Sequence, residues 1–207
     1  MKRALGNICI IIGVIFLLGA AGLLVHNMNE DASAADAAHN VMTVLAEEIE
    51  KREHESADLP KTESEVIERR KEEQEEQSLT IDGNVYMGYL DIPSLNITLP
   101  IMNNWSYDGL RIAPCRYSGT LRDGNLVICA HNYTSHFGRL DELKTGDEIF
   151  IIDINGKAEK YTVADSQELE PARIEDMTSS DFELTLFTCT YTGMTRYAVR
   201  CVNTNYH

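Results

Sequence analysis

The chain has 207 residues, a length that fits one folded domain or at most two. Its formal net charge is −15, from 18 basic and 33 acidic residues, which argues against a nucleic-acid-binding protein because phosphates need a basic surface. The five cysteines are too few and too irregularly spaced for a disulfide scaffold, and no Cys-x-x-Cys pair suggests a zinc site. The glycine-rich signatures GxGxxG and GxxxxGK[ST] are absent, which removes the two commonest nucleotide-binding motifs.

The first segment, residues 1–28, predicts a membrane anchor. The run from Ile8 to Val25 carries no charge and has about the length that an α-helix needs to cross ~30 Å of hydrocarbon. Lys2 and Arg3 precede this run and acidic residues follow it. The positive-inside rule therefore predicts a single-pass membrane protein with a cytoplasmic N-terminus and an extracellular remainder. The alternative is a signal peptide cleaved near Ala32-Ser33-Ala34, but the apolar run is long for such a peptide.

The second segment, residues 29–78, predicts a charged spacer that holds most of the acidity of the chain. Four apolar residues recur in it at helical spacing and indicate one amphipathic stripe. They are Val41, Val44, Leu45 and Ile49. Beyond Glu63 nearly every residue is Glu, Arg, Lys or Gln, as in a solvated helix or a disordered linker. Because a sustained apolar heptad seam is missing, we expect a stalk that holds the next domain off the membrane, and no coiled coil.

The third segment, residues 79–207, predicts a single β domain. Short apolar runs in it are separated by turn signals, of which Asn155-Gly156 is the best candidate for a hairpin. Seven runs predict strands: Tyr86–Ile92, Ile97–Met102, Leu126–Ala130, Ile149–Ile154, Tyr161–Ala164, Leu184–Thr188 and Tyr197–Val202. Seven or eight short strands with few helical periods are typical of a mainly β fold, either a closed barrel or a sandwich.

Two of these predicted strands end in residues that are typical of acyl transfer. One run is followed directly by His131 and another by Cys189, and a neighbouring imidazole and thiol can form a nucleophilic pair. Arg196, on the next strand, is a candidate for stabilising the oxyanion. The residues alone leave other assignments open, because a lone Cys at a strand end is usually a small buried hydrophobe. The competing residues are Cys115, Cys129, Cys201 and His136.

A resemblance to a known family narrows these alternatives. The run Thr185-Leu186-Phe187-Thr188-Cys189 matches the TLxTC pattern of the sortases, cysteine transpeptidases of mainly Gram-positive cell surfaces. His131-Asn132-Tyr133, followed by His136-Phe137-Gly138-Arg139-Leu140 and by Leu143–Asp147, is similar to the sortase histidine strand and the loop after it. The resemblance extends from about Gly88 to Val202, and the order His, Cys, Arg is that of the family.

The resemblance implies a closed eight-stranded β-barrel and a role for each candidate residue. Cys189 would be the nucleophile, His131 the general acid and base, and Arg196 the group that stabilises the oxyanion or orients the substrate carbonyl. Arg200 stays an alternative to Arg196, because residues four apart on a strand face the same side. The backbone N–H of Thr190 is a further candidate oxyanion donor. Three neighbours are the expected substrate-binding residues: Asn132, Thr188 and Thr190.

The implied substrates are secreted proteins that carry an LPxTG-like sorting motif near the C-terminus. The enzyme would cleave between Thr and Gly through a thioester and transfer the protein to a peptidoglycan precursor or another amine acceptor for attachment to the cell wall. The alternatives are a pilin-polymerising sortase, a cysteine hydrolase of surface peptides, and a binding module without turnover. The Asp-Pro-aromatic lid of pilus-building sortases is not visible in the sequence, which favours wall anchoring.

No cofactor is expected, although some sortases bind calcium through acidic loop residues. The candidate calcium ligands are Asp165, Glu168, Glu170, Glu175 and Asp176. Calcium is the weaker expectation, because a hard cation needs a converging set of oxygen atoms and acidic loops are more often only solvated.

Overall fold

A computed structural model describes residues 2–57, 77–172, 174–178, 181–190 and 192–204. The chain divides into two units, residues 1–33 and 34–207. The first unit is the N-terminal part of helix α1 (Lys2–Ala57). Within the described residues α1 alone is long and apolar enough to cross a membrane, and its most apolar 18-residue window has a mean hydropathy of 3.0.

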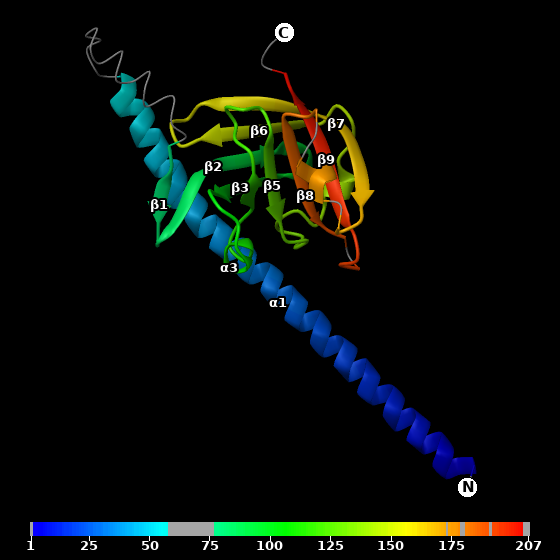
Figure 1. Ribbon diagram of the computed structural model, residues 1–207. Helices are drawn as coiled ribbons and strands as arrows, with labels where there is room; N and C mark the ends of the chain where they lie inside the picture. Colours follow the sequence, from blue (N-terminus) through cyan, green and yellow to red (C-terminus); the bar gives the residue numbers. More distant parts are fainter. Residues whose placement is uncertain (1, 58–76, 173, 179–180, 191, 205–207) are drawn as a thin grey trace. The chain divides into compact units, whose positions relative to one another are not determined.

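The second unit is built around a closed β-barrel (Figure 1). Its strands are β1 (Leu79–Ile81), β2 (Asn84–Ile92), β3 (Ile97–Met102), β4 (Cys115–Ser118), β5 (Leu126–Ala130), β6 (Glu148–Asp153), β7 (Ala158–Leu169), β8 (Leu184–Cys189) and β9 (Arg196–Asn203). The order around the barrel is β2-β3-β4-β5-β8-β9-β7-β6, and β6 pairs with β2 to close it. β1 is added to β2 as a hairpin, β3–β4 and β5–β8 are parallel, and the remaining pairs are antiparallel. The expected mainly β, eight-stranded barrel is confirmed.

All seven predicted strands are present, with bounds that differ by a few residues. The two strands that the sequence did not reveal, β1 and β4, have three and four residues, too few for an apolar alternation to stand out. Short helical turns complete the unit. They are η1 (Pro93–Leu95), α3 (Tyr107–Leu110), η2 (Leu140–Glu142) and α4 (Ile174–Thr178).

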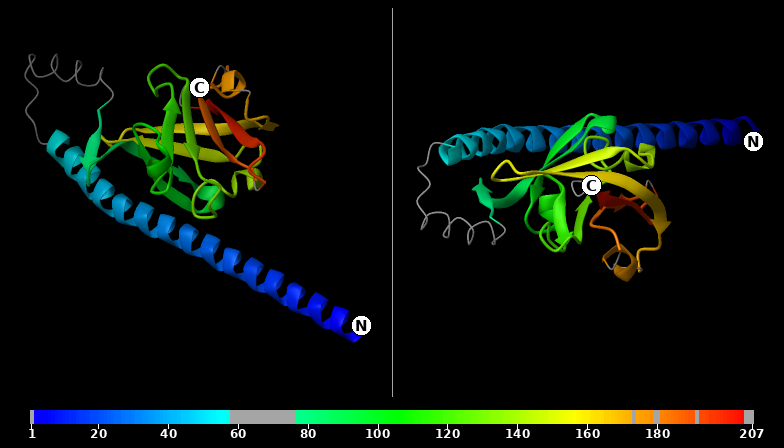
Figure 2. Two further views of the ribbon diagram at one scale, coloured as in Figure 1. Left: turned by 60° about the horizontal axis from the view of Figure 1, so that its bottom comes forward. Right: turned by 90° about the horizontal axis from the view of Figure 1, so that it is seen from above.

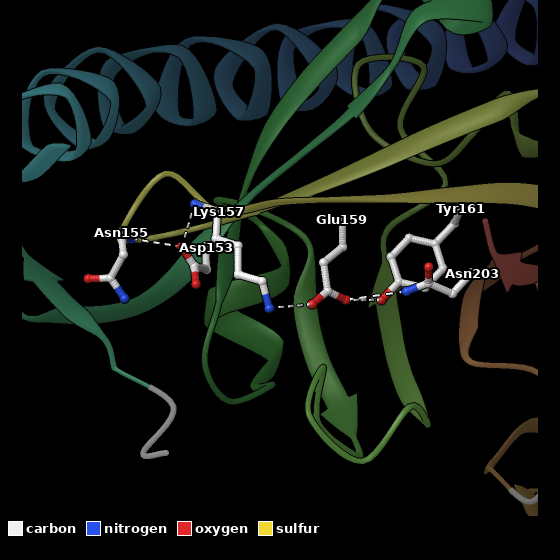
Figure 3. A network of polar contacts seen from close by, with 6 residues as sticks. All are labelled: Asp153, Asn155, Lys157, Glu159, Tyr161 and Asn203. Carbon is white, nitrogen blue, oxygen red and sulfur yellow. Dashed lines mark hydrogen bonds and ion pairs between the residues drawn. The ribbon is translucent and has the colours of Figure 1, made fainter. Parts of the chain in front are cut away.

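The predicted hairpin at Asn155-Gly156 is confirmed and joins β6 to β7. The Asp153 carboxylate accepts hydrogen bonds from the backbone N–H of Asn155 at 2.8 Å and of Lys157 at 2.9 Å (Figure 3). Along β7, Glu159 accepts from the Lys157 ammonium at 3.2 Å and from the Tyr161 hydroxyl at 2.9 Å. The turn is therefore fixed by side chains that bond to nearby backbone, the usual role of Asp and Asn in turns.

The closure of the barrel requires a glycine in β2. Gly88 lies at a register shift of β2, where this strand pairs with both β3 and β6. Its φ of 144° is unfavourable for other residues, and a Cβ atom there would lie 2.0 Å from the backbone oxygen of Ile152. The close approach of β2 and β6 is possible because this position has no side chain.

The first part of the predicted spacer belongs to the folded unit. Leu45 and Ile49 of α1 are 0% and 5% exposed and share an apolar cluster with Tyr86 and Ile154 of the barrel. Val44, by contrast, is 49% exposed, so it lies off the buried stripe. This part of α1 therefore belongs to the barrel unit and packs on it, in a segment for which we expected a stalk. The charged run beyond Glu63 lies almost entirely outside the described residues.

Candidate active site

Strand register brings the three predicted catalytic residues together. β5 and β8 run parallel with Ala130 aligned to Thr188, so the next residues, His131 and Cys189, lie at neighbouring strand ends. β8 and β9 run antiparallel, and Cys189 is directly opposite Arg196. The candidate nucleophile is therefore placed between the two groups that the sequence assigned to proton transfer and oxyanion stabilisation.

Cys189 and Arg196 begin a row of three cross-strand pairs on the outer face of the barrel. Side chains alternate along a strand, and Leu184 and Leu186 of β8 point into the barrel interior. The intervening residues of β8 therefore face outward, each opposite a residue of β9. The pairs are Cys189–Arg196, Phe187–Ala198 and Thr185–Arg200, and we call this row the outer ladder.

Exposure distinguishes Cys189 from the other cysteines of the barrel. Cys189 is half-buried, whereas Cys115, Cys129 and Cys201 are buried. Burial raises the pKa of Cys115 to about 11 and that of Cys201 to about 12, and it also raises the pKa of Cys129. These three thiols therefore stay protonated near neutral pH, as suits structural residues.

The loop after His131 is a tight turn that fixes the histidine at the end of β5. Phe137 is fully buried in the barrel, and its N–H donates to the His131 carbonyl at 3.2 Å. A Cβ atom on Gly138 would lie 2.5 Å from the backbone oxygen of Asn132, so the turn requires a glycine. The rings of His131 and Tyr133 are 4.9 Å apart. His131 is half-buried at the end of β5, whereas the competing His136 is fully buried, so burial favours His131 for contact with a substrate.

In the loop after Cys189, the backbone N–H that we expected to be an oxyanion donor is bonded to another residue of the loop. The backbone N–H of Thr190 donates to the Thr195 carbonyl at 3.0 Å, and the two hydroxyls are 2.8 Å apart. Thr195 also donates to the Glu168 carboxylate. The Thr190 N–H is therefore already bonded to Thr195 in the structure, and its role as an oxyanion donor stays a prediction without support from this geometry. The exposed amide of Asn132 donates to the Thr190 carbonyl at 3.4 Å, so these two expected substrate-binding residues do lie together.

The two candidate arginines have different surroundings. Arg196 is half-buried beside Cys189 and donates to the Thr195 carbonyl at 3.1 Å. Arg200 is 1% exposed and donates to the Thr185 hydroxyl at 2.9 Å and to the Met177 carbonyl at 3.2 Å. The guanidinium of Arg200 is thus held in the protein interior, so this geometry favours Arg196 for contact with a substrate.

The third expected substrate-binding residue, Thr188, faces away from Cys189. It is 4% exposed, and its hydroxyl donates to the Ala130 carbonyl of β5 at 2.9 Å. This bond ties β8 to β5 directly beside the ends that carry Cys189 and His131. The buried side chain of Thr188 lies off the outer ladder, so the structure places it as a packing residue at the end of the strand.

The candidate calcium ligands are divided between two elements. Asp165 and Glu168 lie on β7, Glu170 follows that strand, and Glu175 and Asp176 lie on α4. Among the described residues, no group of three or more His, Cys, Asp or Glu side chains is placed to hold a metal ion. Calcium binding stays a prediction without support from the geometry.

An aromatic row that the sequence did not reveal leads away from the outer ladder. The ring centroids of Phe187 and Tyr117 are 5.2 Å apart, those of Tyr117 and Trp105 are 5.9 Å apart, and those of Trp105 and Tyr107 are 5.7 Å apart. Tyr107 is 77% exposed at the far end. The sequence could have predicted that Phe187 lies on the same strand face as Cys189, because the two residues are two positions apart. No pattern in the sequence connects Phe187 to the other three rings.

A sequence model of the sortase domain matches residues 90–204, a range that contains all three predicted catalytic residues. None of the curated proteins matches the chain.

Among solved structures, the pilus-related sortase C of group B Streptococcus is 26% identical with a TM-score of 0.52, over 62% of this chain and 71% of that one. The sortase C1 of Streptococcus agalactiae is 24% identical with a TM-score of 0.51, over 59% and 69% of the two chains. The sortase D5 transpeptidase of Clostridium perfringens is 21% identical with a TM-score of 0.56, over 76% and 99%. With the family model covering more than half of the chain and these barrels sharing its fold, the chain belongs to the sortases, a family of cysteine transpeptidases.

Proposed function

We propose that this sortase is a membrane-anchored transpeptidase that cleaves an LPxTG-like sorting motif between Thr and Gly and transfers the acyl part to an amine. The observation that carries the proposal is the strand register, which aligns Cys189 with Arg196 and places it beside the end of the strand that leads to His131. A nucleophile, a proton-transfer group and a cation in adjacent positions are what acyl transfer needs.

In the proposed reaction, the Cys189 thiol gives its proton to His131, and its sulfur attacks the carbonyl carbon of the motif threonine. The negative charge that develops on the carbonyl oxygen is stabilised by the guanidinium of Arg196. His131 gives a proton to the glycine nitrogen as the C–N bond breaks, which leaves a thioester on Cys189. An incoming amine loses a proton to His131 and attacks the thioester, so a new amide forms and the thiol is released.

The apolar part of α1 supports the proposed location. This helix is long enough to span a bilayer, and Lys2 and Arg3 precede its apolar run. We place the N-terminus in the cytoplasm and the catalytic unit outside the cell. There it would meet secreted proteins that carry a sorting motif, together with a peptidoglycan precursor or another amine acceptor.

A second candidate function is pilin polymerisation. It is favoured by the similarity to the pilus-related sortase C of group B Streptococcus, at 26% identity. The absence of an Asp-Pro-aromatic lid segment from the sequence favours wall anchoring instead. The two functions differ in the acceptor, a cell-wall amine in one case and a pilin lysine in the other.

The test uses the full chain in detergent micelles with a panel of quenched fluorescent peptides that carry LPxTG-like motifs. We expect cleavage that a Cys189→Ala variant loses, and ligated product when a cell-wall or lysine amine is added. The preferred amine distinguishes the two candidate functions. A carboxylate product alone, with every amine tested, would identify a hydrolase. A folded enzyme whose Cys189 is alkylated readily but which cleaves no peptide of the panel would contradict the proposal.

A further inference from the structure

We propose that Cys115 and Cys129, two buried thiols on the neighbouring strands β4 and β5, form a disulfide bond when the exported chain folds. The bond joins β4 to the strand that leads to His131, and it leaves Cys189 as a free thiol. Neither cysteine is one of the predicted catalytic residues. Only the extracellular location is taken from the proposed function, because that is where proteins meet an oxidising environment.

The strand register places these two cysteines opposite each other. β4 and β5 are antiparallel, and Cys115 is aligned with Cys129. Directly opposite residues of antiparallel strands point to the same face and have Cα atoms about 4.5–5.5 Å apart, within the range of about 4.4–6.8 Å that disulfides span. The bond therefore needs side-chain rotation and no change of register.

The structure holds the reduced form of the pair, in which weak hydrogen bonds orient the two thiols. The Cys129 thiol donates to the Cys115 carbonyl at 3.6 Å, so its sulfur already lies against the partner residue. The Cys115 thiol donates to the Ala113 carbonyl at 3.4 Å. Because thiols are weak donors, oxidation gives up little hydrogen bonding.

Among the described strands, no other two cysteines are aligned. Cys189 is opposite Arg196, and Cys201 has no cysteine opposite it on either neighbouring strand. On its other side Cys129 is aligned with Phe187 of β8, so Cys189 lies two positions further along that strand. Such a diagonal neighbour is about 7–8 Å away, too far for a disulfide without movement of the backbone. The register therefore favours a pairing that spares the nucleophile.

Burial determines when the bond forms. Cys115 and Cys129 are 0% and 5% exposed and share an apolar cluster with Leu45 and Ile49 of α1. The part of α1 that belongs to the barrel unit runs alongside the barrel in both views of Figure 2 (light blue to cyan). Burial also raises the pKa of both thiols, that of Cys115 to about 11, so the thiolate needed for disulfide exchange is scarce once the barrel is folded. The oxidant therefore reacts before folding is complete, and the same burial then protects the bond from reductants.

The oxidant is a low-molecular-weight disulfide. The thiolate of one cysteine attacks this disulfide and displaces one small thiol, which leaves a mixed disulfide on the protein. The thiolate of the other cysteine attacks the protein sulfur of the mixed disulfide, so the bond between Cys115 and Cys129 forms and a second small thiol leaves. Two protein S–H bonds and one S–S bond of the oxidant are thus replaced by one protein S–S bond and two small-molecule S–H bonds.

The test is peptide mapping, because trypsin places each of the five cysteines in a different peptide. Cys115 is in peptide 112–116, Cys129 in 123–139 and Cys189 in 174–196. The full chain in detergent is reduced in urea, and the urea is then diluted away in a mixture of reduced and oxidised glutathione. Free thiols are blocked with N-ethylmaleimide, and the digest is analysed by mass spectrometry without a reductant.

We expect peptide 112–116 to be linked to peptide 123–139, and the Cys189 peptide to carry no link to another peptide of the chain. Blocked thiols at both Cys115 and Cys129 in refolded protein, or a link between peptides 123–139 and 174–196, would overturn the inference. Where refolding in detergent is incomplete, the same digest of full chain from cells that export it, with N-ethylmaleimide added at lysis, decides between these outcomes.

Thermal unfolding with two variants gives an independent measurement. The wild type refolded with the glutathione mixture should melt roughly 6–12 °C above the wild type refolded with a reductant alone, because the bond restricts the unfolded chain. Cys115→Ala should lose this difference. Cys201→Ala is the control and should keep it, because it removes a buried thiol that is aligned with no cysteine. A difference that persists in Cys115→Ala would contradict the inference. None of these measurements depends on peptide cleavage, so their outcome is separate from that of the proposed function.

Discussion

Truncation of one buried leucine tests whether the helix before the barrel is part of the catalytic unit. Leu45 is 0% exposed and lies in the apolar cluster that α1 shares with the barrel. Replacing such a leucine by alanine removes its transfer free energy and leaves a cavity, at a cost of 2–5 kcal/mol in typical cores, and we expect about 3 kcal/mol here. For a unit of this size that cost corresponds to a melting temperature lower by about 6–12 °C.

The assay is urea and thermal unfolding of the full chain in detergent, followed by circular dichroism. The β signal of the barrel is recorded separately from the helical signal. Val44 supplies the control, because it is the adjacent residue and is 49% exposed, so Val44→Ala should change stability by less than about 0.5 kcal/mol. If Leu45→Ala unfolds at the same urea concentration as Val44→Ala, residues 34–57 are a stalk and the reasoning from burial is refuted.

Four more predictions concern the thiols, the barrel closure and the hydrogen bond between β8 and β5. At pH 8 iodoacetamide should modify Cys189 well before Cys115, whose pKa of about 11 keeps it protonated, and mass spectrometry that finds Cys115 modified first would contradict this. Because the Cys115 pKa is raised on folding, its contribution to stability is complete below its unfolded value of 9.0 and declines above it, so unfolding should become easier at alkaline pH. Gly88→Ala should destabilise the barrel by about 3 kcal/mol, because the added Cβ would meet the backbone of Ile152. Gly146 has a φ of 98° but no atom close to the position of a Cβ, so Gly146→Ala should cost only about 1 kcal/mol. Equal losses of stability in the two variants would refute the close approach of β2 and β6. Thr188→Val should lower the free energy of unfolding by about 1–2 kcal/mol, because it removes the hydrogen bond to the Ala130 carbonyl. Thr188→Ser keeps the hydroxyl and should be closer to the wild type in stability. Equal stability of the Val and Ser variants would contradict a contribution from this bond.

The sequence by itself determined the strands with a clear apolar alternation and the hairpin at Asn155-Gly156, because both depend on neighbours within a few residues. It also identified the family, because the residues around His131 and Cys189 form short motifs with a fixed order. The short strand β4 was not predictable, because it is defined by its pairing with β5. Nor could the sequence tell that Leu45 and Ile49 are buried and Val44 is not, because this depends on where the barrel contacts the helix.

Only the tertiary structure decided between residues of the same type. Arg196 and Arg200 face the same side of β9, and the register with β8 and the position of α4 assign one to Cys189 and the other to the interior. In the same way, the N–H of Thr190 is occupied because the next strand returns close to it. A pattern in the sequence states which side a residue faces, but its role depends on what the fold places opposite it, and that is set by strand register and burial.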